Sequence, residues 1–423
     1  MSVQRLLLVA YQCGPGMGSV SQIGWEWYSR LAQQYRVTLV THVRNRQAIA
    51  AAGGAVGDSE VIYIDTEWFA GPLYRLAQRL FPRSEHSVFL IASLDYFVFD
   101  AAAWRLLGRR QEQGERWDIL HRVTPVSLAT PTWLGRLGIP TVIGPLNSGL
   151  KDPPGFSAIM RQESTWLVNL REFGRWFDGV IGSSRHATRL LVATQATLAM
   201  VPPRYRKRCE FMLENGVELD QFEPTPWPAA PGPQQPLEVL FVGRLVPVKA
   251  LSLLIDAVAQ VKAAGQAVRL TVVGDGSMRA EWERHAQTLA LGESVRFVGS
   301  QPLTEVAGFM RRCHVFCLPS VRESGGAVLL EAMASARPVI AIRFGGPAEL
   351  VDDSVGALVA PGNPQQVTDD IAKLLLQLLL HPAEWAERGQ AGRRKVEAHY
   401  SWNAKVEAAG RLYRAILNER TPA

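Results

Sequence analysis

The chain has 423 residues, of which 47% are hydrophobic and 20% are charged, and it contains four cysteines. These values exclude a disordered chain and a disulfide framework, and the length predicts two domains. The net charge is +6, and most of the surplus falls in the first half of the chain. It is too small to indicate a nucleic-acid-binding protein, but it could favour an anionic acceptor or an anionic membrane surface.

The chain begins with the pattern of a βαβ unit. Residues 5–11 predict a buried strand, 14–19 a glycine-rich loop, 19–34 a helix and 37–41 a second strand. In dinucleotide-binding folds, an acidic residue at the end of the second strand binds the ribose. Here that strand leads into Arg44 without any Asp or Glu. The sequence therefore argues against NAD binding.

Three later segments of the first half predict strands that end in polar loops, at 118–121, 141–144 and 178–182. Ligands of open α/β sheets bind at such strand ends. His121 ends the first segment and is a candidate catalytic residue, although a lone histidine at a strand end is more often structural. Ser184 follows the third segment and is a candidate helix N-cap.

Residues 68–110 are rich in aromatic residues and arginines. One interpretation is a helical core with a solvated basic face, and the other is shallow contact with an anionic membrane. The longest apolar run, 88–99, is interrupted by Asp95, so no segment is expected to span a bilayer. The apolar run at 6–10 is too short for a signal peptide, and the few cysteines fit a reducing compartment. These features predict a cytoplasmic protein.

A proline-rich segment, residues 223–236, predicts a linker before the second half of the chain. Strands are then predicted at 237–242, 269–273 and 295–298, with a helix over 251–264. Because strands and helices alternate in both halves, we expect an α/β fold with two doubly wound Rossmann-like domains facing a cleft.

Arg244 and Lys249 follow the first strand of the second half, and Gly274 ends the next strand in a loop that could line a sugar or phosphate pocket. Cations at the carboxyl end of a strand can stabilise the negative charge of a phosphate leaving group. The alternative is that both are solvated loop cations. No C-x-x-C, H-E-x-x-H or D-x-D pattern indicates a bound metal.

The stretch 314–351 predicts a strand over 314–318, a loop, a helix over 327–336 and a second strand over 339–342. Gly326 precedes the helix, whose unpaired N–H groups suit a phosphate. Glu323 lies in the loop and Glu331 lies among apolar residues of the helix. A carboxylate on an inward helix face needs hydrogen-bond donors, which ligand hydroxyl groups would supply. The alternative is that Glu331 lies on the solvated face and Glu323 in an ordinary loop.

This stretch resembles the E-x7-E element of retaining family-4 glycosyltransferases, which have the two-domain GT-B architecture. The resemblance implies that Glu323 contacts the transferred sugar and that Glu331 binds the ribose of the nucleotide. It places the diphosphate on the backbone amides after Gly326, which belong to Ala327 and Val328. It also implies that Gly16 lies across the cleft from the donor phosphates. The G-R-x-x-x-x-K element that contains Arg244 and Lys249 is similar to one in the same family.

The resemblance implies a retaining, metal-independent hexosyltransferase that uses a nucleotide-diphosphate sugar and no cofactor. Its acceptor would be a glycan, a glycolipid or a small molecule, in bacterial polysaccharide or glycolipid synthesis, with peripheral contact at the inner face of the membrane. The domains expected are an acceptor-binding domain over 1–222, a nucleotide-sugar-binding domain over 237–399, and a C-terminal helix in 400–423 that packs back on the first. The alternatives are a sugar-nucleotide epimerase of the same fold and a catalytically inactive glycan-binding subunit.

Overall fold

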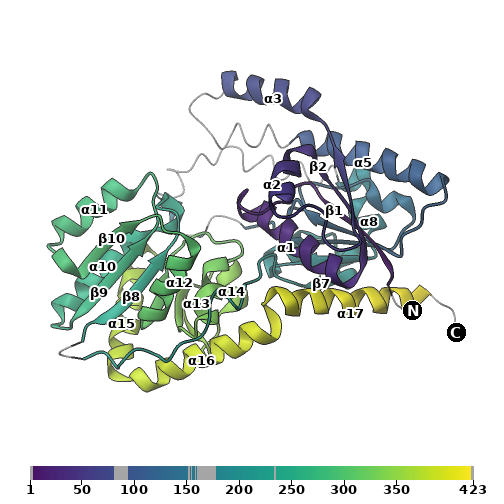
Figure 1. The fold of residues 1–423 in the computed structure, drawn as a ribbon. Coiled ribbons are helices and arrows are strands. Elements are labelled where there is room, and N and C mark those ends of the chain that lie inside the picture. Colours follow the sequence, from purple (N-terminus) through teal and green to yellow (C-terminus); the bar gives the residue numbers. More distant parts are fainter. Residues whose placement is uncertain are drawn as a thin grey trace. The chain divides into compact units, whose positions relative to one another are not determined.

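The computed structural model describes residues 3–80, 94–150, 153, 155–157, 159, 178–232 and 235–420. The chain forms two compact units that are not consecutive in the sequence. Unit 1 contains residues 1–149, 164–214 and 405–423, whereas unit 2 contains 150–163 and 215–404. Figure 1 shows that each unit is built on its own sheet with helices packed against it.

Unit 1 has a parallel sheet of seven strands in the order β3-β2-β1-β4-β5-β6-β7. Its strands are β1 (Arg5–Ala10), β2 (Arg36–His42), β3 (Glu60–Ile64), β4 (Ile119–Thr124), β5 (Thr141–Leu146), β6 (Arg189–Val192) and β7 (Cys209–Phe211). Its helices are α1 (Ser19–Gln34), α2 (Arg46–Ala51), α3 (Glu67–Leu80), α5 (Asp95–Glu112), α8 (Ser183–His186), α9 (Gln195–Met200) and most of α17 (Trp402–Arg420).

Unit 2 has a parallel sheet of six strands in the order β10-β9-β8-β11-β12-β13. Its strands are β8 (Leu237–Val242), β9 (Val268–Val273), β10 (Val295–Gly299), β11 (Val315–Leu318), β12 (Val339–Ile342) and β13 (Gly356–Val359). Its helices are α10 (Leu251–Ala263), α11 (Arg279–Thr288), α12 (Leu303–Arg312), α13 (Ala327–Ala334), α14 (Gly346–Leu350), α15 (Pro364–Leu380) and α16 (Pro382–His399). In both sheets the strand order reverses once, beside β1 and beside β8, as in doubly wound folds.

The central strands of both sheets are buried on both faces, which explains their nearly continuous apolar sequences. In unit 1, for example, side chains of β1 and β4 pack with those of α5 in one core. The members of that core at most 1% exposed are Leu7, Val9, Val40, Tyr96, Phe99, Ala103, Leu107, Leu120 and Leu134. The strand predictions for the second half agree with β8 to β12 to within one residue at either end.

The strand predicted at 178–182 is wrong. Residues 178–181 are helical, and Gly182, with φ of 81°, precedes the short helix α8. Ser184 lies inside α8 and is not its N-cap; its backbone N–H donates to Asp178 Oδ1 at 2.9 Å. The strand of this region is β6, eleven residues after Asp178, and it pairs with β5. Local hydrogen bonding by Asp178 therefore favours a helix where the apolar pattern indicated a strand.

The proline-rich segment expected to be a linker packs along unit 2. The buried Arg337 donates to the carbonyl oxygen of Thr225 at 3.3 Å and to its hydroxyl at 2.6 Å. Trp227 Nε1 donates to the carbonyl oxygen of His314 at 2.9 Å, and His314 Nε2 bonds to that of Ala229 at 2.9 Å. These bonds fix the segment to unit 2 over at least residues 225–229.

Lys405, near the start of α17, is a lysine buried within unit 1. Its ammonium group donates to the carbonyl oxygen of Leu213 and lies 5.9 Å from the centroid of the Trp27 ring. Burial lowers the pKa of Lys405 from 10.5 to about 7, although the nearby carboxylate of Glu214 acts in the opposite direction. The folded protein therefore disfavours the charged form of this side chain.

We expect the stability of unit 1 to rise with pH because of Lys405. Between pH 7 and 10.5 the unfolded chain binds a proton that folded Lys405 has released, so the free energy of unfolding increases with pH. The slope from this one group is at most about 1.4 kcal/mol per pH unit. Urea unfolding of the wild type and Lys405→Met at pH 7 and pH 9 measures it. Parallel pH dependences in the two proteins would contradict the assignment.

Candidate functional site

The candidate site in unit 2 lies where the strand order of its sheet reverses, between β8 and β11. Ligands of doubly wound folds bind outside the carboxyl ends of strands at this point. The loop 243–249 follows β8 and the loop 319–326 follows β11. The two loops are joined by a hydrogen bond of 2.9 Å from Val321 N–H to the carbonyl oxygen of Val248. We call the residues of these loops, together with Gly274 and Glu331, the switch-point site.

Lys249 and Glu323 form an ion pair in the switch-point site. The ammonium nitrogen of Lys249 donates to Glu323 Oε2, and the two side chains are only 16% and 14% exposed. Lys249 ends a short 3-10 turn, and Ala250 then adopts a positive φ of 44° that leads into α10. The structure thus brings together two residues that are 74 positions apart in the sequence.

The loops after β8 and β9 are in close backbone contact. A Cβ atom on Gly274 would lie 2.0 Å from the carbonyl oxygen of Gly243, so no other residue fits there without displacing the backbone. The N–H of Leu245 donates to the carbonyl oxygen of Asp275 at 2.9 Å. Between these fixed points, Arg244 is exposed, and its side chain makes no hydrogen bond or ion pair within the described part of the chain. Its guanidinium is therefore available to a ligand.

The loop after β11 is fixed by a second glycine contact. Gly346 N–H donates to the carbonyl oxygen of Glu323 at 3.0 Å, and a Cβ atom on Gly345 would lie 2.1 Å from that oxygen. Gly326 then takes a left-handed φ of 59° at the start of α13, without a side-chain cap. The backbone N–H groups of Ala327 and Val328 contact no acceptor within residues 235–420. This helix end can bind an anion through both amides.

Glu331 lies on α13, one turn after the unpaired amides of Ala327 and Val328. Burial raises the pKa of its carboxyl group from 4.5 to about 7. In the described ranges no donor contacts this carboxylate. A partly buried carboxylate without donors is unfavourable unless a ligand supplies them. The position therefore suits a ligand that carries hydroxyl groups.

His121 and Gly16 lie in unit 1. His121, in β4, is fully buried: its Nε2 donates to the carbonyl oxygen of Gly144 at 2.8 Å, and its Nδ1 bonds with the hydroxyl of Tyr413 at 2.6 Å. Burial lowers the pKa of His121 to about 4, so its ring is neutral at pH 7. Both nitrogens are occupied, which favours the structural alternative. Gly16 lies in an exposed loop with φ of 72°, where its N–H points to Gln22 Oε1 at 3.4 Å.

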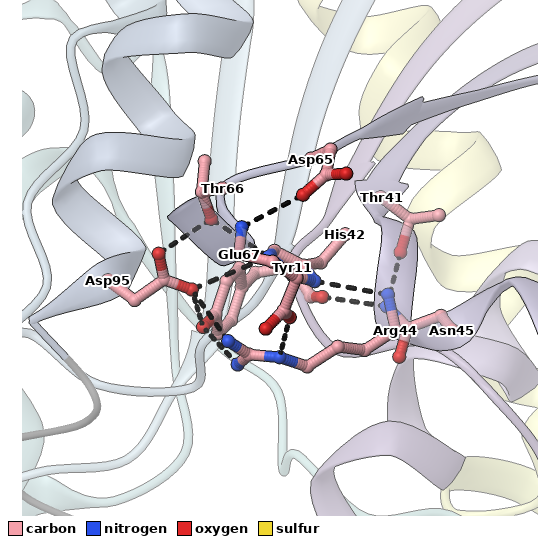
Figure 2. A network of polar contacts seen from close by, with 9 residues as sticks. All are labelled: Tyr11, Thr41, His42, Arg44, Asn45, Asp65, Thr66, Glu67 and Asp95. Atoms are coloured by element: carbon pink, nitrogen blue, oxygen red, sulfur yellow. Dashed lines mark hydrogen bonds and ion pairs between the residues drawn. The ribbon is translucent and has the colours of Figure 1, made fainter. Parts of the chain in front are cut away.

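A second polar site lies in unit 1, at the carboxyl ends of β1, β2 and β3 (Figure 2). We call it the Arg44 network; its members are Tyr11, Thr41, His42, Arg44, Asn45, Asp65, Thr66, Glu67 and Asp95. None of these residues was predicted from the sequence to be a site residue. The available signal was Asp95, a carboxylate that interrupts the longest apolar run of the chain.

None of the described helices combines the length and the hydrophobicity needed to span a bilayer. Within the ranges that the structure describes, no three His, Cys, Asp or Glu side chains are grouped so that they could hold a metal ion.

Residues 227–391 match the model of the family described as Glycosyl transferases group 1. The D-inositol 3-phosphate glycosyltransferase of Segniliparus rotundus is 31% identical over 242 residues, which cover 55% of this chain and 50% of that protein. The phosphatidyl-myo-inositol mannosyltransferase of Mycobacterium leprae is 32% identical over 207 residues, covering 48% and 53%. The chain spans about half the length of the curated relatives it matches.

Solved structures resemble the whole chain at lower sequence identity. Sucrose-phosphate synthase from Thermosynechococcus elongatus has a TM-score of 0.62 at 20% identity and covers 98% of this chain and 100% of its own. The Anabaena protein Alr3699/HepE in complex with UDP has a TM-score of 0.61 at 16% identity, with coverage of 98% and 100%. These similarities confirm the predicted GT-B fold with two doubly wound α/β domains.

The partly buried carboxylate of Glu331 gives a stability prediction. Between pH 4.5 and 7 the folded protein holds a proton on Glu331 that the unfolded chain has lost, so stability falls as pH rises through this window. Glu331→Gln removes the effect, and we expect it to raise the free energy of unfolding at pH 8 by about 1–3 kcal/mol. It should change stability little at pH 4.5.

Urea unfolding at both pH values measures the difference. The control is Glu387→Gln, an exposed glutamate in α16. If Glu331→Gln and Glu387→Gln shift the midpoint equally at pH 8, the carboxylate of Glu331 is not destabilised by burial.

Proposed function

Because residues 227–391 belong to the glycosyl transferases group 1 family, we propose that the chain transfers a sugar from a nucleotide-diphosphate sugar to a hydroxyl group, with retention of configuration. The observation that carries the proposal is the Lys249–Glu323 ion pair at the switch point of unit 2. A cation for the leaving group and a carboxylate for the sugar are thereby held together at the edge where doubly wound sheets bind ligands.

A nucleotide-diphosphate sugar fits the groups that line this edge. Arg244 and Lys249 supply two positive charges, and the amides of Ala327 and Val328 supply two N–H donors to a diphosphate. Glu331 would accept hydrogen bonds from the ribose hydroxyl groups. A nucleotide donor is also supported by the names of similar proteins, since Alr3699/HepE was solved in complex with UDP and in complex with UDP-glucose.

In the mechanism we propose, the bond between the sugar and the diphosphate breaks first. Lys249, Arg244 and the amino end of α13 stabilise the charge that develops on the departing phosphate oxygen. Glu323 stabilises the positive charge that develops on the sugar ring. The acceptor hydroxyl attacks from the face that the diphosphate leaves, and its proton passes to the departing phosphate. No side chain of the protein acts as a nucleophile, and we assign no catalytic role to His121.

We also propose a cytoplasmic location with peripheral contact between α3 and an anionic membrane. On α3 the side chains of Trp68, Leu76 and Leu80 are exposed, at 71%, 51% and 60%. Because their spacings are eight and four residues, these three lie on one side of the helix. Arg75 and Arg79, which are also exposed, could contact anionic headgroups beside this apolar stripe. The acceptor would then be a glycan or a lipid-linked molecule at that surface.

The decisive experiment is incubation of the purified chain with a panel of UDP-, GDP- and ADP-sugars in excess EDTA, with mass spectrometry of the products. We expect slow hydrolysis of one donor to free sugar and nucleoside diphosphate, because Arg244, Lys249 and the α13 amides replace a metal at the diphosphate. An interconversion of sugar nucleotides would instead favour an epimerase. No turnover of any donor, with or without Mg²⁺ and Mn²⁺, would contradict the proposal.

Two substitutions should affect the reaction differently. Lys249→Ala removes a charge that acts mainly on the leaving group, so we expect kcat to fall about 100- to 1,000-fold. Glu331→Ala removes ribose contacts that are equal in the ground and transition states, so the donor KM should rise at least about tenfold with a smaller change in kcat. Steady-state kinetics with the donor found by the panel measures both.

The matched control for Lys249→Ala is Arg269→Ala. Arg269 also pairs with a glutamate, Glu238, at 2.6 Å, but both lie near the amino ends of β8 and β9, away from the switch-point site. Circular dichroism should show that all variants are folded. Near-normal turnover of Lys249→Ala would show that the ion pair has only a structural role.

A further inference from the structure

The Arg44 network of unit 1 has a buried centre, the carboxylate of Asp95. This side chain is 0% exposed and comes from the first residue of α5. It accepts hydrogen bonds from the hydroxyl of Tyr11 at 2.9 Å and from the hydroxyl of Thr66 at 2.6 Å. A buried carboxylate is unfavourable unless donors surround it. Here the donors come from residues that follow β1 and β3, so Asp95 joins these strand ends (Figure 2).

His42, at the end of β2, takes part in the network as a neutral ring. The backbone N–H of Arg44 donates to His42 Nδ1 at 3.1 Å, which fixes the proton on Nε2. That Nε2 then donates to the hydroxyl of Thr66 at 2.8 Å, and Thr66 donates to Asp95. Burial and the positive charge of Arg44 lower the pKa of His42, while the neighbouring carboxylates act against this. His42 therefore adds no charge at pH 7.

The network holds the guanidinium of Arg44 in one place at the surface. Arg44 Nε donates to Glu67 Oε1 at 2.5 Å, Nη1 lies 3.4 Å from the hydroxyl of Tyr11, and Nη2 lies 3.5 Å from Asp95 Oδ2. The side chain is nevertheless 44% exposed. Two of its five N–H groups donate to Glu67 and Tyr11, and the ion pair with Asp95 holds the third side of the guanidinium, so N–H groups remain for a ligand. An arginine fixed on three sides presents donors in a defined geometry.

Glu67, the first residue of α3, lies beside Arg44 and is 46% exposed. Its Oε1 accepts from Arg44, whereas its Oε2 has no hydrogen bond or ion pair within the described residues. The backbone N–H of Glu67 is fixed by Asp65 Oδ1 at 2.9 Å. Arg44 and Glu67 therefore present donors and an acceptor side by side. This is the set of groups that binds a pair of neighbouring hydroxyls, each of which can donate and accept.

The charge of the network indicates which hydroxyl compound would bind. Arg44 contributes one positive charge, and Asp65, Glu67 and Asp95 contribute three negative charges. With His42 neutral, the formal net charge is −2. A phosphate or carboxylate on the ligand would be repelled at this edge, although the first half of the chain carries a positive surplus. The network thus favours a neutral ligand.

We propose that Arg44 and Glu67 bind two neighbouring hydroxyl groups of a neutral sugar or cyclitol, and that this molecule is the acceptor of the transferred sugar. The binding of the hydroxyl groups does not depend on the proposed function. Only the role of the bound molecule as acceptor rests on it. The edge is that of the unit 1 sheet next to its point of strand reversal, where β1 meets β4, and ligands of such sheets bind there. Asp95 acts through Arg44 as a positioning residue.

The first test is direct binding, which does not depend on turnover. Saturation-transfer difference NMR on the full chain uses neutral methyl hexopyranosides, their disaccharides and myo-inositol as probes, with glucose 6-phosphate and myo-inositol 1-phosphate as anionic probes. We expect signals from at least one neutral probe and weaker ones from its phosphorylated counterpart. Arg44→Ala should reduce the neutral signal, and Arg46→Ala should leave it unchanged. Arg46 is the matched control because it is exposed two residues away and lies over the Tyr63 ring at 4.7 Å.

The second test is transfer to the same probes from the donor that is hydrolysed. Arg44→Ala should lower kcat/KM for the neutral acceptor about 10- to 100-fold through the acceptor KM, with the donor KM unchanged. Arg44→Lys should not restore it, because lysine lacks the planar fork. Glu67→Gln removes one negative charge without a change of shape. It should therefore raise the ratio of kcat/KM for an anionic acceptor to kcat/KM for a neutral acceptor.

The outcomes separate this inference from the proposed function. A wild-type chain that binds a neutral probe through Arg44 but hydrolyses no donor would overturn the proposed function and leave the binding site standing. A chain that hydrolyses a donor but binds no neutral probe, prefers the phosphorylated probes, or retains full binding in both Arg44→Ala and Glu67→Gln would overturn the inference. Circular dichroism of Arg44→Ala shows whether the protein still folds when Asp95 loses its ion-pair partner. Glu67→Gln leaves the bonds of Asp95 in place, so this variant tests the inference even if Arg44→Ala does not fold.

Discussion

The switch-point site depends on backbone contacts that only glycine allows. Gly274 lies against Gly243, and Gly345 lies against the carbonyl oxygen of Glu323, at separations that leave no room for a Cβ atom. Each contact joins a loop that bears a charged side chain to the loop of another strand. Arg244 and Glu323 are therefore positioned by main chain, which moves less than side chains do. A larger residue at either glycine would displace the charges without touching them.

Much of the fold and of the candidate site of unit 2 could be predicted from the sequence, because the signals for them are local. A stretch of about ten residues is enough to recognise each of these features: the apolar runs of strand length, Gly326 and the cations after β8. The pairing of Lys249 with Glu323 is not local, yet the topological rule for strand ends brings both to one edge. The resemblance to a known family implied a separate role for each of the two residues, and the structure brings them into an ion pair.

Unit 1 was less predictable, because its decisive contacts join distant parts of the chain. His121 bonds with Tyr413, which is 292 positions away, and no local pattern distinguishes a histidine buried in this way from a catalytic one. Asp95 bonds with Tyr11 across 84 positions. The strands β6 and β7 were not predicted, and β7 has only three residues. Where burial depends on remote partners, periodicity alone cannot assign the role of a polar residue.

The division of unit 1 among three parts of the sequence has a consequence for synthesis. Unit 2 is complete once residue 404 has been made, whereas unit 1 needs residues 405–420 of α17. Until then the buried ring of His121 has no Tyr413 to bond, and the carbonyl oxygen of Leu213 has no Lys405. On the ribosome, the domain that is begun first is therefore finished last. The nascent chain must keep its first sheet soluble, with its core open along one helix, until residues 405–420 have been translated.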